Sequence, residues 1–140
     1  MSSEVVSEHE HLRILWDPEL GAVHMQWLDP VGGAPYRDGL DEGLRVLVDK
    51  GAERWLADLR WLGVLSRADE AWVNDEWLPR ATQAGLRLMA IVSPESSKAQ
   101  VSIRELMLAL STQEAIAEQR LTTQSFESLD DAQAWLRERG

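Results

Sequence analysis

The sequence predicts an α/β fold built on a mixed sheet, and two features of the chain lead to that prediction. Residues 11–28 contain two strand-like runs around a short turn, which is the pattern of an antiparallel hairpin. After residue 30, apolar strand-like runs alternate with stretches of helical periodicity. Strands separated by helices are joined by parallel crossover connections, so we expect about five strands with helices packed on the sheet.

The N-terminal hairpin has one register that sorts the side chains of both strands. Residues 11–16 and 22–28 alternate in character around a turn-forming stretch that ends at Gly21. When Trp16 is placed opposite Val23, one face of both strands becomes wholly apolar, which predicts this pairing. That face contains Leu12, Ile14, Trp16, Val23, Met25 and Trp27.

A long helix is expected next, over about residues 36–50. Its apolar residues recur at helical spacing and are Tyr36, Leu40, Leu44, Leu47 and Val48. Gly51 is expected to end the helix. Gly39 and Gly43 lower the helix propensity, and we interpret them as positions at which the helix lies close to the sheet.

The middle of the chain predicts two further strands on either side of a capped helix. The apolar runs at 52–59 and 86–92 are typical of strands that are covered on both faces. Ser66 stands where a helix is expected to begin, in the pattern of an N-cap. Pro79 is expected to break that helix at the preceding residue and to open a second short helix.

The last third of the chain predicts a helix over 101–110, a final strand over 121–126 and a closing helix capped by Ser128. The pattern is weakest over residues 111–124. We treat residues 1–140 as a single domain, and we expect residues 1–8 to be a flexible N-terminus.

Composition indicates a folded, cytoplasmic protein. A length of 140 residues fits one domain, and 44% hydrophobic with 27% charged residues is the balance of a folded chain. The absence of cysteine excludes disulfides, thiolate nucleophiles and cysteine-bound metals. No signal-peptide pattern and no apolar run of about 20 residues are present, so we expect no transmembrane segment. The formal net charge of −10 argues against nucleic-acid partners.

Several short segments carry a resemblance to a known family. They are Trp55-Leu56-Ala57-Asp58-Leu59, Trp72 with Trp77-Leu78-Pro79, Ala84-Gly85-Leu86-Arg87, Ala90-Ile91-Val92, and Phe126 with Asp131-Ala132 and Trp135-Leu136. In this order of elements the chain resembles the STAS superfamily, the anti-sigma-factor-antagonist fold, and most closely its SpoIIAA-like bacterial members of unassigned function. The resemblance implies a non-enzymatic protein-interaction or regulatory module.

The same resemblance makes Ser66 a candidate switch position. In the anti-sigma-antagonist branch, a partner kinase phosphorylates the serine of an Asp-Ser pair that follows the strand after the first helix. That pair falls on Ser66-Arg67 here, so arginine occupies the phosphorylated position. The chain departs from the family pattern at this point, and the N-cap pattern already accounts for Ser66.

No constellation of residues predicts catalysis, a metal or a cofactor. The three histidines are His9, His11 and His24, and in the hairpin register they do not converge on one point. Paired carboxylates such as Asp69-Glu70 are interpreted as polar faces and helix first turns. Asp58 is the exception, because it lies within a strand that is expected to be buried, where we expect it to cap or to pair with Arg60. We therefore expect no enzyme activity.

An apolar group around the end of the 52–59 strand is the main candidate for function. Its members are Trp61, Leu62, Val64, Leu65, Trp72 and Trp77. Three interpretations are open: ordinary core packing, an interface, or a hydrophobic cleft. An interface would serve a protein partner or a second copy of the chain in a homodimer. A cleft would make the protein a carrier of a lipid or another apolar small molecule.

Overall fold

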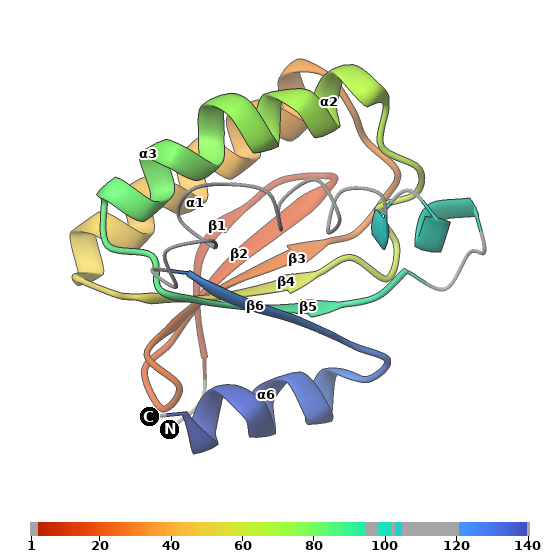
Figure 1. Ribbon diagram of the computed structural model, residues 1–140. Helices are drawn as coiled ribbons and strands as arrows, with labels where there is room; N and C mark the ends of the chain where they lie inside the picture. The colour runs from red at the N-terminus through yellow and green to blue at the C-terminus, as the bar shows by residue number, and fades with distance from the viewer. Residues whose placement is uncertain (1–2, 95–97, 102, 105–120, 140) are drawn as a thin grey trace.

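A six-stranded mixed sheet runs through the protein, with its strands in the same order as in the sequence (Figure 1). The computed structural model describes residues 3–94, 98–101, 103–104 and 121–139. The strands are β1 (Glu4–Glu8), β2 (Leu12–Asp17), β3 (Ala22–Trp27), β4 (Arg54–Asp58), β5 (Leu88–Val92) and β6 (Thr122–Phe126). The first three pair antiparallel, and β3 to β6 pair parallel. The α/β fold with an N-terminal hairpin and parallel crossovers is therefore confirmed.

The sheet has six strands where about five were expected, because residues 4–8 form β1 and not a flexible N-terminus. Strand β1 pairs with β2, with Ser7 opposite Ile14, and it contains a bulge between Val5 and Ser7. Its side chains are almost all exposed, including Val5 and Val6. Edge strands of this kind are held by backbone hydrogen bonds. Their sequences therefore need not alternate between apolar and polar residues, which is the pattern that would have predicted a strand.

The predicted hairpin register is confirmed at every pair of the apolar face. Trp16 lies opposite Val23, Ile14 opposite Met25, and Leu12 opposite Trp27. Met25 and Trp27 are buried, at 0% and 1% exposed. This face of the hairpin becomes one wall of the main core.

Helices cover the two faces of the sheet unequally, as Figure 1 shows. They are α1 (Ala34–Lys50), α2 (Arg67–Trp72), the π-helical turn η1 (Val73–Trp77), α3 (Leu78–Gln83) and α6 (Leu129–Glu138). Helices α1 to α3 lie on one face, where they enclose the larger core, and α6 lies on the other over β4 to β6. Ser128 caps α6 by accepting a hydrogen bond from the Asp131 amide at 3.1 Å. The helix expected over 101–110 lies mostly outside the described residues, and those of its residues that are described are helical.

Two glycines let α1 lie directly on the sheet, as the sequence suggested. A methyl group added at Gly39 would come within 2.7 Å of the Trp27 ring, and one added at Gly43 within 2.6 Å of the Trp55 ring. Such distances are shorter than any van der Waals contact between carbon atoms. Glycine lowers the stability of the helix at these two positions, but it allows close contact between α1 and the tryptophan rings.

The chain stays helical before Pro79, so the expected break at Leu78 is absent, while Pro79 does lie in the first turn of a second short helix, α3, as expected. Helix α2 continues through η1 into α3, and both Trp77 and Leu78 have right-handed helical backbone angles. Proline cannot donate a backbone hydrogen bond, and its ring clashes with the carbonyl four residues earlier in a regular helix. In the π-helical turn before Pro79, backbone hydrogen bonds join residues five apart and not four apart. This change of spacing relieves the clash between the proline ring and the carbonyl.

Within the described part of the chain, none of the helices combines the length and the apolar character needed to cross a bilayer.

We expect Gly43→Ala to lower the free energy of unfolding by about 1–3 kcal/mol, because the added methyl group overpacks the contact with Met25 and Trp55. At an open helix position the same change would stabilise by about 1 kcal/mol. Urea unfolding measures the difference, and Asp49→Ala at an exposed position of α1 is the control that should cost nothing. A Gly43→Ala protein more stable than the wild type would contradict the close approach.

Candidate functional site

The loop that follows β4 is fixed to its surroundings at both ends. At its start, the Leu59 amide donates to the Val92 carbonyl at 3.0 Å, which ties the loop to the end of β5. Further along, Gly63 has a φ of 85° and lies against the ring of Pro30. A side chain at residue 63 would meet both the unfavourable backbone angle and the proline. The loop is therefore a defined structure of the molecule.

Asp58, the last residue of β4, anchors the same loop through an ion pair. Its side chain is completely buried, and its two oxygens accept hydrogen bonds from Arg60 at 2.9 and 2.7 Å. The Arg60 amide donates to the same carboxylate at 3.2 Å. The predicted pairing of Asp58 with Arg60 is thus present, and this carboxylate fixes the turn that leads into the loop.

The four apolar residues of the loop divide into two pairs. Leu62 and Leu65 are buried, at 1% and 4% exposed, and belong to the main core. Trp61 and Val64 point into solvent, at 51% and 57% exposed. The buried pair holds the backbone, and the exposed pair presents two apolar side chains to solvent on the loop that follows β4. We call Trp61 and Val64 the loop surface.

The two remaining tryptophans of the predicted group do not join this surface. Trp72 is partly buried, and the guanidinium groups of Arg37 and Arg80 lie over its ring, 5.5 and 5.8 Å from the ring centroid. Trp77 is 1% exposed and donates its indole N–H to the Leu40 carbonyl of α1 at 3.2 Å. Both residues attach α2, η1 and α3 to α1, so their role in the described structure is packing.

The space beside Trp77 is too small for a lipid chain. It measures about 40 Å³ and is lined by core side chains that include Trp27 and Trp55. Ligand pockets usually enclose about 300–1,000 Å³. Within the described part of the chain, the tryptophan-rich core is therefore filled by its own side chains at this point.

Ser66 acts as the N-cap of α2, as predicted. Its hydroxyl oxygen accepts a hydrogen bond from the Asp69 amide at 3.1 Å. The Ser66 hydroxyl is therefore engaged in capping the first turn of α2. The structure places Ser66 directly after the loop surface.

Asp69 is the residue of this region whose role the sequence did not reveal. It lies in the first turn of α2, one of the two positions expected for the acidic pairs, but it is only 2% exposed. Its carboxylate accepts the Gly33 amide at 2.9 Å and the Arg37 guanidinium at 3.1 Å. Gly33, the N-cap of α1, has no side chain that could cap the helix. Asp69 of α2 therefore supplies the acceptor for a backbone amide at this end of α1. Burial would raise the pKa of Asp69, but these hydrogen bonds outweigh it and hold that pKa below its usual value.

Two of the histidines lie together, and the third lies apart from them. His9 contacts Glu42 of α1 at 2.9 Å and stacks on His11, with ring centroids 5.9 Å apart. His24 lies on the opposite face of the sheet, is 6% exposed, and its Nε2 has no hydrogen-bond partner among the described residues. Burial lowers the pKa of His24, and the nearby Asp58 and Asp17 oppose that shift only in part. In the described ranges, no three His, Asp or Glu side chains are grouped as metal ligands would be.

Comparison of the chain with protein-family models, with curated proteins and with solved structures gave no match. Function is therefore inferred from the geometry of the chain itself.

We expect Ser66→Ala to lower the free energy of unfolding by about 1 kcal/mol, as the loss of a helix cap usually does. Asp69→Ala should cost about 2–3 kcal/mol, since it leaves both the Gly33 amide and Arg37 without their acceptor. Thermal or urea unfolding measures both, and Ser128→Ala, which removes the same kind of cap from α6, is the matched control. If Ser66→Ala proved fully stable, the capping role would be wrong.

We expect stability to fall as the pH drops below about 6.5, the ordinary pKa of histidine. The unfolded chain takes up a proton on His24 near that pH, while the folded chain resists it because the folded pKa is lower. Urea unfolding between pH 8 and pH 5 measures the effect, and His24→Phe should reduce the slope. An unchanged slope in the variant would show that His24 does not carry this dependence.

Proposed function

We propose that the protein is a non-enzymatic, cytoplasmic protein-interaction or regulatory module of the STAS or SpoIIAA-like kind. It binds a protein partner, or a second copy of the chain, through the loop surface of Trp61 and Val64. The element order that suggested the resemblance, an antiparallel hairpin followed by parallel crossovers, supports the assignment to this class. The proposal rests mainly on one observation, the exposure of two apolar side chains on a fixed loop.

Apolar side chains on an anchored loop are well suited to binding because the backbone loses little conformational freedom on association. In the chain, Trp61 lies between Arg60, which pairs with the buried carboxylate of Asp58, and Leu62, whose side chain is buried in the core. Tryptophan is among the residues that contribute most energy at protein interfaces, and a rigid loop avoids the entropic cost of ordering. A full interface buries roughly 800 Å² on each partner, so Trp61 and Val64 would form its centre, with polar neighbours as the rim.

The charge of the chain sets a condition on the partner. A formal net charge of −10 favours a partner with a basic surface, because complementary charge accelerates association. In a homodimer, apolar contact between two copies of the loop surface has to offset the repulsion between them. The proposal therefore includes both forms of association, with Trp61 at the centre of each.

Ser66 is the candidate regulatory position in this proposal, since it directly follows the loop surface. A phosphate on its hydroxyl would stand at the amino end of α2, beside the buried carboxylate of Asp69. Repulsion between the two anions would disturb the cap and thus the adjacent loop.

The test compares Trp61→Glu and Val64→Glu with the wild type, and Val48→Glu is the matched control. Val48 is 55% exposed on α1, as exposed as the loop residues but on a different element. We expect both loop variants to stay folded by circular dichroism, because each side chain already reaches water. In size-exclusion chromatography with light scattering, they should shift from dimer to monomer or lose a bound partner, while Val48→Glu should not.

Native mass spectrometry of the purified wild type distinguishes this function from the lipid-carrier alternative. A dimer mass or a bound protein supports the interaction module. A monomer that carries an apolar small molecule, and that loses this molecule in the Trp61→Glu variant without a change in oligomeric state, would support the carrier instead. Loop variants that associate as the wild type does would contradict the role of the loop surface.

A further inference from the structure

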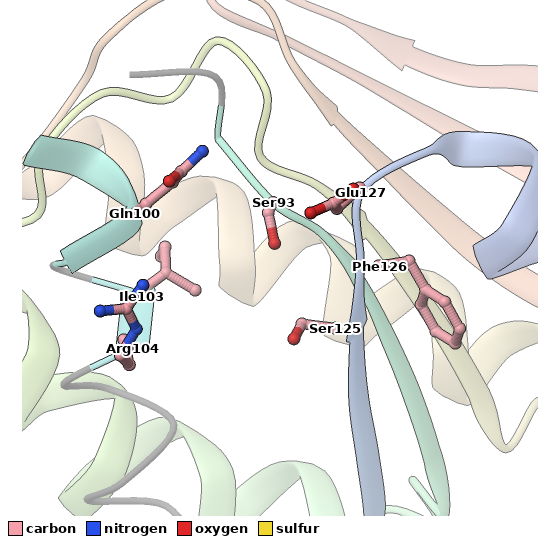
Figure 2. Close-up of a pocket in the computed structure, with 7 residues that line it drawn as sticks. All are labelled: Ser93, Gln100, Ile103, Arg104, Ser125, Phe126 and Glu127. Atoms are coloured by element: carbon pink, nitrogen blue, oxygen red, sulfur yellow. The ribbon is translucent and has the colours of Figure 1, made fainter. Parts of the chain in front are cut away.

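A polar cavity lies at the carboxyl ends of β5 and β6 (Figure 2). Its volume is about 420 Å³, which falls within the usual range for small-molecule sites. The carboxyl ends of parallel strands are also the usual place for ligands in α/β sheets. The lining residues are Ser93, Gln100, Ile103, Arg104, Ser125, Phe126 and Glu127.

Hydrogen bonds and burial fix the walls of this cavity. The Ser93 amide donates to the Phe126 carbonyl at 2.8 Å, which joins the ends of the two strands. The Gln100 side chain donates to the Pro94 carbonyl at 3.0 Å, and so holds the helical residues 98–101 against the end of β5. Ile103 is 4% exposed and packs into the main core. The cavity is therefore built by ordered contacts.

Four polar side chains of the cavity have no partner within the described part of the chain. They are the hydroxyls of Ser93 and Ser125, the guanidinium of Arg104 and the carboxylate of Glu127. Figure 2 shows both hydroxyls directed into the space between β6 and the helical residues that carry Arg104. Arg104 and Glu127 line the same cavity without forming an ion pair, so opposite charges are held apart by a space of ligand size.

Four other arginines of the described part of the chain form close ion pairs with carboxylates. Arg13 pairs with Glu8, Arg37 with Asp69, Arg60 with Asp58, and Arg80 with Asp41. With 24 acidic and 14 basic residues, the chain has carboxylates to spare. Arg104 lines the polar cavity with no carboxylate partner among the residues that the structure describes, so its guanidinium can receive an anionic group from outside. Arginine binds carboxylates through two parallel hydrogen bonds, which makes it well suited to that task.

We propose that this cavity binds a small zwitterion. Its anionic group pairs with Arg104 and accepts hydrogen bonds from the hydroxyls of Ser93 and Ser125. Its ammonium group, at the other end, pairs with Glu127. The carboxylate of Glu127 repels a ligand that is only anionic, and Arg104 repels one that is only cationic. The site is separate from the loop surface and does not depend on the protein-interaction function.

Titration of the full chain with ω-amino acids of increasing length tests this site. The probes are glycine, 4-aminobutyrate and 6-aminohexanoate, and butyrate and butylamine carry only one of the two charges. Shifts of backbone amide signals in NMR report binding. We expect one of the two longer zwitterions to bind at least tenfold more tightly than either single-charge probe, with shifts centred on Ser93 and Ser125.

Variants assign the two ends of the ligand. Arg104 and Glu127 are both exposed, so Arg104→Gln and Glu127→Gln should keep the fold. Each should weaken the best zwitterion about tenfold. Arg104→Gln should strengthen the binding of butylamine and Glu127→Gln that of butyrate, because each variant removes the charge that repels the probe. Arg67→Gln, at an exposed arginine outside the cavity, is the control and should leave the binding of every probe unchanged.

Three results would each overturn the proposal. They are equal binding of butyrate and the zwitterions, no binding of any probe at millimolar concentrations, and an Arg104→Gln variant that binds the zwitterions as the wild type does.

Discussion

The contact between the glycine face of α1 and the tryptophan rings of the sheet is the constraint on which the rest of the structure depends. Gly39 and Gly43 are one helical turn apart, and each admits the edge of a large ring, from Trp27 and Trp55 respectively. This contact sets the distance between α1 and the sheet. The chain contains one phenylalanine and one tyrosine against seven tryptophans, so these rings supply much of the volume of the core.

The second layer of helices is built upon α1 once that distance is set. Trp77 donates its indole N–H to the carbonyl of Leu40, and Asp69 caps the start of α1 at Gly33. Both contacts use backbone groups of α1, and such groups are in place only when the helix is correctly seated. The loop between β4 and α2 is then closed at both ends, which is why Trp61 can remain in solvent without making the loop flexible.

Patterns of apolar residues predicted the fold well, and single polar residues much less well. The hairpin register followed from one rule of alternation, and the closeness of Gly43 to the sheet followed from its cost in helix propensity. Strand β1 was not predicted because its contacts are made by the backbone. The burial of Asp69 was not predicted either, since its partners Gly33 and Arg37 lie more than 30 residues away in sequence. Sequence placed Trp61 and Leu62 in one apolar group, and only the structure separated the exposed residue from the buried one.

The uneven exposure of the tryptophans gives the molecule a built-in optical reporter. An indole in water emits at longer wavelengths than one in an apolar core, and only a solvated ring is readily reached by aqueous quenchers. Among the seven tryptophans, Trp61 alone belongs to the exposed class, while Trp16, Trp72 and Trp135 are partly buried and Trp27, Trp55 and Trp77 are buried. The red edge of the intrinsic emission therefore follows the environment of one loop residue in the unlabelled, unmodified chain. Whatever covers that residue shifts this part of the spectrum towards the blue, and the core tryptophans serve as an internal reference.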